Sequence, residues 1–341
     1  MEKNEYSKIT MKDVAAKAGV TIGTVSHVIN ATAPISYETK KKVLRVIKEL
    51  GYIPNPMARY MRSKKSHMIG FLIPNINNYF HSNIARTFID EAGKEDYSVL
   101  ILGYNYSLEG EKRAIESLLQ YNVETIIIAN GYDDESYIRR ILDQNVPVIL
   151  VDRSTILESA CYIQYDNKKV IFEAVSMLKK KGYKSIGFFS EPLRLINLED
   201  RYKSYVQAMK ENGYIFNANH VFISDKLCLD NIKNGYLYMK ELLKDYPKEA
   251  LPQAFIASCD LTAVGMMRAI NEFNYRVPED FGIIGCDNID LSGYTRPRLT
   301  TINQDQVLMG KELWKMAKAV ISREKVENVT LNQELIIRES C

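Results

Sequence analysis

The sequence predicts a small helical N-terminal domain followed by a larger α/β core made of two lobes with parallel sheets. Residues 10–50 carry apolar side chains at helical spacing and contain no strand-like run. From residue 68 onward, short apolar runs alternate with amphipathic stretches, and this alternation occurs twice along the chain. Such alternation is typical of parallel sheets that are covered by helices on both faces.

Length and composition agree with this organisation. The chain has 341 residues, enough for two or three domains, and 46% hydrophobic with 26% charged residues is typical of a globular protein. No apolar run reaches the roughly 18 residues that a membrane span needs. The first five residues are polar and of mixed charge, unlike a secretory signal. We therefore expect a cytoplasmic protein without a membrane partner.

The net charge of +3 conceals an asymmetry between the two parts of the chain. Residues 1–65 hold 13 Lys/Arg and 5 Asp/Glu, a net charge of +8, whereas the remainder holds 32 and 37, a net charge of −5. A basic domain on a mildly acidic core indicates that only the N-terminal part meets a polyanion, although a solvated lysine-rich surface also has this composition.

The five cysteines are scattered and form no C-x-x-C pair. A disulfide framework or a zinc site would need clustered cysteines, so we expect reduced, mostly buried thiols, no metal and no cofactor.

Residues 10–50 are expected to form three short helices. Thr10, Thr21 and Ser36 can cap their N-termini, and Gly19 and Gly51 can end the first and the third. The expected inward-facing side chains recur at helical spacing and are Val14, Ala15, Ala18, Val25, Val28, Ile29, Val43, Leu44, Ile47 and Leu50.

A linker with two prolines separates the helical domain from the core. We place the boundaries at 1–55 for the helical domain, 56–66 for the linker or hinge helix, and 67–341 for the core. Within the core we expect lobe 1 at about 67–165 plus 295–322, and lobe 2 at about 166–294 plus 323–341. The expected strands are 68–73, 99–102, 125–129, 147–151, 185–189, 221–223, 254–257 and 282–286. The expected helices lie near 80–96, 109–122, 134–145, 167–182, 199–213, 231–245 and 260–274.

Two short helices joined by a glycine turn, the second opening on small polar residues, form a helix-turn-helix pattern. In this motif the second helix enters the major groove of double-stranded DNA. Many helical hairpins share this spacing, so the spacing alone does not assign DNA binding.

Longer segments resemble the LacI/GalR (lac repressor) family. They are ITMKDVAAKAGVTIGTVSHVIN at 9–30, LGYIPN at 50–55, GCDN at 285–288 and PRLTTINQ at 297–304. The resemblance covers nearly the whole chain. It implies a DNA-binding head, a hinge, and a core like that of the periplasmic sugar-binding proteins, with a ligand cleft between the lobes at the carboxyl ends of the strands.

For the head, the resemblance implies contacts of two kinds. Ile22, Gly23 and His27 are expected to face the bases; His27 can donate to a purine acceptor, whereas Ile22 offers only apolar contact. Contacts to phosphates, which position the head without reading sequence, are expected from Lys12, Thr21, Thr24, Ser26 and Asn30.

For the hinge, the resemblance implies a helix that forms on DNA and enters the minor groove. Ala58 and Arg59 belong to this segment, and Met61 takes the place of the family's leucine that wedges between base pairs.

For the core, the resemblance implies a site for a small sugar or sugar derivative. Residues that fall where the family lines its cleft are Tyr79, Phe80, Asp152, Arg153, Arg201, Asp260 and Asp287. Carboxylates and a guanidinium that converge at strand ends can bind vicinal hydroxyls through paired hydrogen bonds. Leu195 matches the arginine that reads purines in the purine repressor, so a purine is less expected than a sugar or sugar acid.

The resemblance thus implies a homodimeric transcription regulator on a pseudo-palindromic operator, most simply a repressor of carbohydrate-metabolism genes. An enzyme is disfavoured because the four histidines are dispersed and no nucleophile, phosphate or dinucleotide motif is present. A transport protein is disfavoured because it would need a signal peptide and no basic head. The alternative that stays open is a regulator controlled mainly by a partner protein, in the manner of catabolite control protein.

Overall fold

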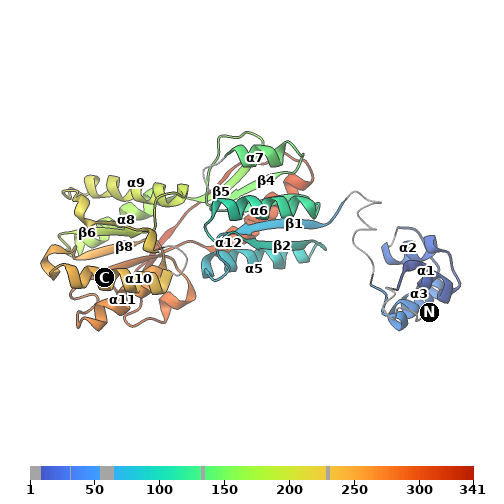
Figure 1. Ribbon diagram of the computed structural model, residues 1–341, viewed down its shortest axis with the longest axis horizontal. Helices are drawn as coiled ribbons and strands as arrows, with labels where there is room; N and C mark the ends of the chain where they lie inside the picture. The colour runs from blue at the N-terminus through green and yellow to red at the C-terminus, as the bar shows by residue number, and fades with distance from the viewer. Residues whose placement is uncertain (1–8, 31, 54–64, 132–134, 228–230) are drawn as a thin grey trace. The chain divides into compact units, whose positions relative to one another are not determined.

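The computed structural model describes residues 9–30, 32–53, 65–131, 135–227 and 231–341. The chain forms two compact units, Met1–Ser66 and His67–Cys341. We call these units the head and the core (Figure 1).

The head consists of α1 (Met11–Ala18), α2 (Ile22–Asn30) and α3 (Tyr37–Leu50). Thr10 caps α1 in a capping box with Asp13, and the Ser36 hydroxyl accepts a hydrogen bond from the Thr39 N–H at the start of α3. Gly19 and Gly51 end α1 and α3 with φ of 61° and 62°, the left-handed conformation that glycine adopts at little cost. The three expected helices are therefore present with their expected caps.

The core of the head is built from small and β-branched side chains. Val14, Val25 and Val43 are fully buried where the three helices meet. The prediction was wrong for Leu44, which is 48% exposed, and Val46 is buried on α3 in its place. Val43 and Val46 are three residues apart and lie on one face of α3, whereas Leu44 lies outside this contact.

Lobe 1 contains a six-stranded parallel sheet in the order β11-β5-β4-β3-β1-β2. Helices α5 and α12 cover one face and α6 and α7 cover the other, so the sheet is doubly wound (Figure 1). The elements of lobe 1 are β1 (Met68–Ile73), α5 (Tyr79–Gly93), β2 (Ser98–Gly103), α6 (Leu108–Gln120), β3 (Thr125–Ala129), α7 (Glu135–Leu142), β4 (Val148–Val151), β5 (Cys161–Tyr165), α12 (Gln306–Ile321) and β11 (Val329–Leu331).

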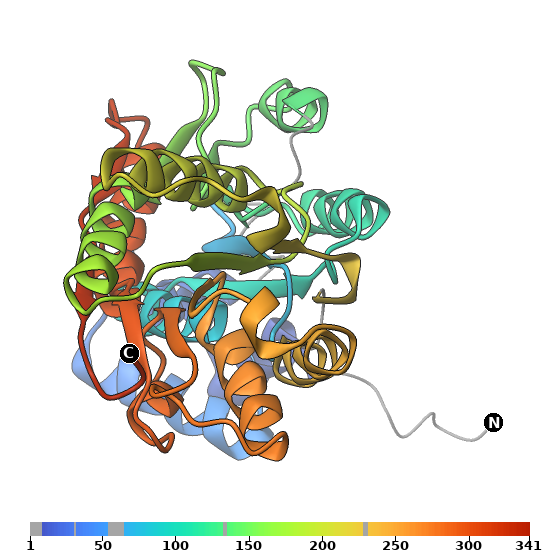
Figure 2. The same ribbon diagram turned by 90° about the vertical axis from the view of Figure 1, so that its left-hand side faces the viewer.

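Lobe 2 contains a second six-stranded sheet in the order β12-β10-β9-β8-β6-β7, parallel except for β12. Helices α8 and α9 cover one face, and α10 and α11 cover the other (Figure 2). The elements of lobe 2 are α8 (Asn167–Lys180), β6 (Ile186–Ser190), α9 (Ile196–Glu211), β7 (Val221–Ile223), α10 (Asn231–Asp245), β8 (Ala254–Ala257), α11 (Asp260–Glu272), β9 (Gly282–Asp287), β10 (Thr300–Asn303) and β12 (Glu334–Ile336).

Two of the expected lobe boundaries differ from the structure. We expected residues 295–322 in lobe 1, but β10 (Thr300–Asn303) pairs with β9 in lobe 2. We expected residues 323–341 in lobe 2, but β11 (Val329–Leu331) pairs with β5 in lobe 1. The chain crosses between the lobes after β5, after β10 and after β11. The second crossing falls within residues 295–322 and the third within residues 323–341, so neither segment belongs to a single lobe.

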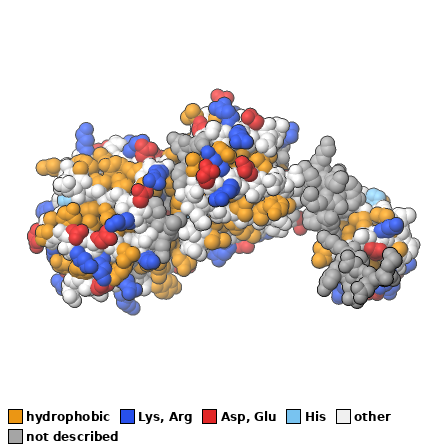
Figure 3. Space-filling model, viewed as in Figure 1, with side chains coloured by type: hydrophobic (Ala, Val, Ile, Leu, Met, Phe, Trp, Pro, Cys, Tyr) orange, Lys and Arg blue, Asp and Glu red, His pale blue; other side chains and the backbone are white. Residues whose placement is uncertain are grey.

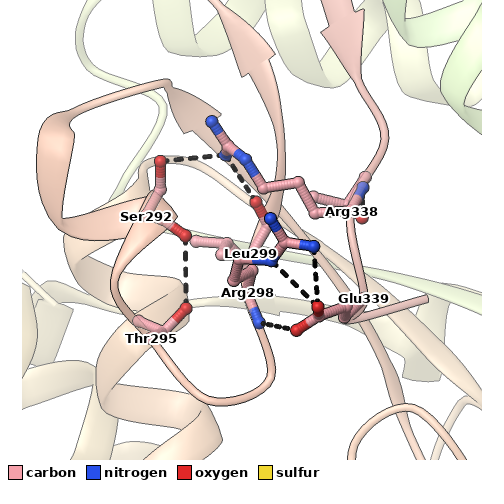
Figure 4. Close-up of polar contacts among 7 residues, drawn as sticks. Ser292, Thr295, Arg298, Leu299, Arg338 and Glu339 are labelled. Atoms are coloured by element: carbon pink, nitrogen blue, oxygen red, sulfur yellow. Dashed lines mark hydrogen bonds and ion pairs between the residues drawn. The ribbon is translucent and has the colours of Figure 1, made fainter.

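The segment that follows β12 is fastened to the loop that follows β9. Arg338 donates hydrogen bonds to the Ser292 hydroxyl and the Leu299 carbonyl oxygen, and the Arg298 side chain donates to the Glu339 carboxylate (Figure 4). A further bond joins the Arg338 guanidinium to the Asn288 side-chain oxygen at 2.7 Å. These contacts hold the loop that begins directly after Asp287.

Acidic and basic side chains intermingle on the visible face of the core (Figure 3). Among the described residues, no helix is both long enough and apolar enough to cross a lipid bilayer.

Candidate functional site

The exposed surface of α2 carries the three residues expected to face bases. Ile22 is 49% exposed although it is apolar, and Gly23 and His27 are exposed on the same helix. His27 Nδ1 lies 2.9 Å from the Thr32 hydroxyl, which fixes the ring and leaves Nε2 available for an outside partner. Helix α2 therefore presents an exposed apolar side chain and a hydrogen-bonding side chain together, as a recognition helix requires.

The expected phosphate contacts divide into two groups. Lys12 and Thr21 are exposed, and the Thr21 hydroxyl accepts from the Thr24 N–H as an N-cap. Ser26 is 6% exposed, and the Asn30 amide donates to the Ser26 carbonyl and hydroxyl oxygens. The Ser26 and Asn30 side chains thus bond to each other, and the Thr21 and Thr24 hydroxyls also lie 3.0 Å apart. Lys12 and Thr21 are exposed, whereas Thr24 and Asn30 are half-buried.

The hinge residues Ala58, Arg59 and Met61 lie outside the described residues.

The core contains a cavity of about 250 Å³ that is lined by both lobes at the carboxyl ends of their strands. Four of the predicted residues line it: Phe80 and Asp152 from lobe 1, and Arg201 and Asp287 from lobe 2. Asp152 directly follows β4 in the lobe 1 sheet and Asp287 ends β9 in the lobe 2 sheet, so the carboxyl ends of both sheets bring a carboxylate to the cavity.

Arg201 is 3% exposed and is held by neutral acceptors on lobe 2. Its Nε donates to the Asn167 side-chain oxygen at 3.3 Å, and its Nη1 donates to the Ser258 carbonyl oxygen. The guanidinium is thereby fixed in the cavity wall before any ligand arrives, which reduces the entropy cost of binding.

Three of the predicted residues do not line this cavity. Tyr79 is 53% exposed and lines an adjacent hollow instead. Arg153 is buried beside Gly131 and Glu111, because the chain turns away from the cavity after Asp152. Asp260 is fully buried at the start of α11.

The Asp260 carboxylate has a structural role inside lobe 2. It accepts hydrogen bonds from the Thr301 hydroxyl at 2.5 Å and the Ile289 N–H at 3.0 Å. A side chain at Gly285 would lie 2.1 Å from Asp260 Oδ1, so glycine is needed where the carboxylate passes β9. Asp260 therefore ties α11 to β9 and β10.

Backbone conformation is unusual around the cavity. Five lining residues other than glycine have positive φ angles, a conformation that costs free energy and is concentrated at functional sites. They are Asn105 (50°), Tyr106 (50°), Asn130 (58°), Asp152 (55°) and Asp287 (114°).

The buried ionisable groups of the cavity have shifted pKa values. Burial raises the pKa of Asp152, partly offset by the Arg201 guanidinium. Burial and the neighbouring Asp260 carboxylate raise the pKa of Asp287 well above its usual range. Burial lowers the pKa of His81 to about 3, so His81 is neutral at physiological pH.

Comparison with known proteins identifies the family. Residues 10–55 match the profile of "Bacterial regulatory proteins, lacI family", and residues 175–341 match a "Periplasmic binding protein-like domain". Catabolite control protein A of Priestia megaterium is 30% identical over 335 residues, covering 97% of this chain and 99% of the relative. The chain belongs to the LacI family. It is a DNA-binding transcriptional regulator, and regulators of this family are not enzymes.

Solved structures of LacI-family proteins share the fold over almost the whole chain. The lac repressor dimer bound to operator and an anti-inducer superposes with a TM-score of 0.86 at 27% identity, covering 98% of this chain and 99% of the repressor. The complex of the transcriptional regulator CelR with cellobiose superposes with a TM-score of 0.72 at 25% identity, covering 98% of this chain and 100% of that structure.

Sequence reasoning missed several residues that line the cavity of this LacI-family core. Glu191 follows β6, and its carboxylate accepts from the Asn231 amide at 2.6 Å and from the Ser258 hydroxyl. Asn197, on α9, donates to Asp152 Oδ2 at 2.8 Å. The other lining residues that we did not predict are Asn78, His81, Asn105, Tyr106, Asn130, Pro192, Arg194, Leu195, Leu198, Asp225, Ser258, Cys259 and Gln304.

Several buried polar atoms in the cavity wall have no hydrogen-bond partner in the described part of the chain. They are Asn130 Oδ1, Asn197 Oδ1, Gln304 Nε2 and His81 Nδ1. Buried polar groups are normally bonded to protein or to water, so these atoms are available to hydrogen-bond with water or a polar ligand. Within the described residues, no group of three metal-ligating side chains is close enough to hold a metal ion.

Proposed function

We propose that the chain acts as a homodimeric repressor that binds a pseudo-palindromic operator and is controlled by a small sugar-like effector in the core cavity. The observation that carries the effector part is the concentration of unpartnered polar atoms around a cavity at the strand ends of both lobes. Amide, carboxylate and guanidinium groups of this kind suit the vicinal hydroxyls of a sugar.

The relatives support the same assignment. The lac repressor was solved as a dimer on operator DNA, and CelR was solved with cellobiose. Carbohydrate-metabolism genes are accordingly the proposed targets.

For DNA recognition we propose that Ile22, Gly23 and His27 face the bases and that Lys12, Thr21 and Thr24 contact phosphates. Ser26 and Asn30 can contact DNA phosphates only if the hydrogen bonds between these two residues rearrange. In the hinge, Ala58 and Arg59 enter the minor groove and Met61 wedges between two base pairs, a contact that kinks DNA at a cost of a few kcal/mol.

The effector and the operator are coupled through the two lobes. A ligand that contacts Asp152 in lobe 1 and Arg201 in lobe 2 favours their closed arrangement. Closure changes the separation of the hinges in the dimer and so the affinity for operator, and operator must change effector affinity by the same factor.

Fluorescence anisotropy on a labelled pool of short palindromes, at two salt concentrations, tests the DNA-binding part. We expect tight, sequence-selective binding that weakens steeply with salt. Binding without sequence preference would contradict it.

A thermal-shift screen of sugars tests the effector part, because a ligand that binds only the folded state raises the melting temperature. The alternative is control by a partner protein, and the 30% identity to catabolite control protein A supports it. If no small ligand shifts the melting temperature, the partner alternative replaces the effector proposal.

A further inference from the structure

We propose that the effector of this regulator carries a positively charged nitrogen, as an amino sugar does, and that Glu191 and Asp287 bind it. The inference rests on the proposed ligand-controlled function of the core cavity and names the chemical class of its ligand.

The first argument is the balance of charge around the cavity. Its lining includes four carboxylates and two guanidinium groups. Arg194 and Asp225 pair with each other at 2.8 Å and are both largely exposed, so they neutralise each other. Asp152, Glu191 and Asp287 then face Arg201 alone, so three carboxyl groups share one guanidinium.

The second argument is that these carboxyl groups form no ion pair within the described protein. No ion pair between described residues includes Asp152, Glu191, Asp287 or Arg201. The identified hydrogen bonds of Arg201 go to the Asn167 side chain and the Ser258 carbonyl, both neutral acceptors. Carboxylates taken out of water without a countercharge are costly, and a cationic ligand removes that cost.

Glu191 is oriented for such a ligand. One carboxylate oxygen accepts from the Asn231 amide at 2.6 Å and the other accepts from the Ser258 hydroxyl at 2.5 Å. Neutral donors fix the direction of the carboxylate and leave its charge in place. Since Glu191 directly follows β6 and Asp287 ends β9, both side chains start from the strand-end edge of the same sheet.

Asp287 adds a proton-linked component. Burial and the surrounding carboxylates raise the pKa of Asp287 well above its usual range, so this carboxylate binds a proton more tightly than an exposed one does. An ammonium group replaces this proton, whereas a sugar acid or sugar phosphate adds a further negative charge. Among the sugars that the sequence had suggested, the structure therefore disfavours sugar acids.

The rest of the cavity fits a hydroxylated ring. Asn130 Oδ1, Asn197 Oδ1 and Gln304 Nε2 are buried without a partner in the described part of the chain, and they offer both acceptors and a donor to hydroxyl groups. A cavity of about 250 Å³ is slightly smaller than sites for drug-sized ligands and suits a single ring.

Isothermal titration calorimetry on the full-length protein tests the proposal. The probes are glucosamine, galactosamine and mannosamine, their parent hexoses, their N-acetyl derivatives, and glucuronate and galacturonate. We expect at least one amino sugar to bind at least tenfold more tightly than its parent hexose, and N-acetylation, which removes the charge, to abolish the advantage.

Glu191→Gln keeps the size of the side chain and an oxygen that can accept a hydrogen bond, but removes the charge. It should reduce the preference for the amino sugar over its hexose at least tenfold. Glu199→Gln is the matched control: Glu199 lies on α9 in an exposed ion pair with Lys203, and its substitution should change the preference less than twofold.

Tighter binding of a hexose or a hexuronate than of every amino sugar would overturn the inference while leaving the proposed function intact. An unchanged preference in Glu191→Gln would overturn it as well. Binding of no sugar of any charge would overturn both the inference and the sugar part of the proposed function.

Discussion

Arg201 is a cation that the core holds rigidly in the wall of its cavity. It is 3% exposed, and neutral acceptors on lobe 2 orient its guanidinium. Its planar fork can bind two neighbouring oxygens of a ligand, a geometry that no other side chain provides.

We therefore expect Arg201→Ala to lower effector affinity by about 100-fold, the size of a lost charge-assisted hydrogen bond in a buried site. Calorimetry on the variant measures the loss. Operator binding without effector should stay within about twofold of wild type, because the substitution lies in the core. Arg194→Ala is the comparison: Arg194 is exposed and already paired with Asp225, so its loss should cost less than tenfold. Equal losses in the two variants would contradict this role for Arg201.

His81 is expected to make the stability of the core depend on pH. Its pKa is lowered from 6.5 to about 3 by burial, so the unfolded chain binds a proton below pH 6.5 that the folded chain refuses. The free energy of unfolding must then fall as the pH drops from 6.5 toward 3, by up to about 1.4 kcal/mol per pH unit.

Urea denaturation of wild type and His81→Gln at pH 7 and pH 5 measures this effect. Glutamine can still hydrogen-bond to Asn130, which lies 3.0 Å from His81 Nε2, but it does not titrate. We expect the wild type to lose about 1 to 2 kcal/mol more than the variant over this interval. The same pH dependence in both proteins would show that His81 is not the titrating group.

The sequence located part of the cavity residue by residue. Asp152 and Asp287 could be predicted because they stand at the ends of apolar runs, where a carboxylate indicates a ligand site at the end of a strand. Asp260 was placed wrongly by the same reasoning, because only the fold reveals that Thr301 and the Ile289 N–H use its oxygens. Asn197 was missed because we expected the helix to begin at residue 199, whereas α9 begins at Ile196.

At the scale of elements, α10 and α11 pack so closely that a glycine is required between them. A Cβ atom at Gly265 would lie 2.1 Å from the Ile232 carbonyl oxygen and 2.6 Å from the Tyr236 nitrogen, both backbone atoms of α10. The two helices together form one wall of the lobe 2 core.

Gly265→Ala should therefore lower the free energy of unfolding by at least about 2 kcal/mol, because the helices must separate. Gly93→Ala is the matched control. Gly93 is exposed at the end of α5 with nothing within 4 Å of its would-be Cβ, and alanine there should stabilise by up to about 1 kcal/mol. Chemical denaturation measures both, and a neutral Gly265→Ala would contradict the close approach.

The eight strands expected from apolar runs are all present, but β5, β10, β11 and β12 were not predicted. Strand β10 reads Thr-Thr-Ile-Asn, which is too polar for an apolar run, yet three of its residues are buried because both faces of the sheet are covered. Strands β11 and β12 have three residues each. Short strands of this kind are stabilised by neighbours distant in sequence, which explains the two misplaced lobe boundaries.

At the scale of the whole molecule, the doubled alternation of strands and helices was sufficient to predict two doubly wound lobes. It could not predict that the chain crosses between them three times, because a crossing leaves no periodic signal. The crossings matter for the site: Asp152 lies between β4 and β5, before the first crossing, and Gln304 lies on the second. The cavity is thus lined close to the segments that join the lobes.

The charge of the whole chain leads to a last expectation, about salt. The core carries a net charge of −5 and its charged side chains intermingle on the visible face, whereas the head carries +8 (Figure 3). Phosphate contacts should therefore come from the head, and the logarithm of the operator affinity should fall linearly with the logarithm of salt concentration.

Lys12→Gln should reduce the steepness of that line by about 0.9, the contribution of one phosphate contact, and weaken binding to all sequences alike. His27→Gln should leave the slope unchanged and alter which base is preferred at one position of each half-site, because His27 is exposed on α2 with Nε2 available. Anisotropy titrations of both variants from 50 to 200 mM salt separate the phosphate contact of Lys12 from the base contact of His27. Loss of the first changes the salt dependence, and loss of the second changes the base preference. If Lys12→Gln changed base preference and left the slope intact, the division between positioning and reading on this head would have to be reversed.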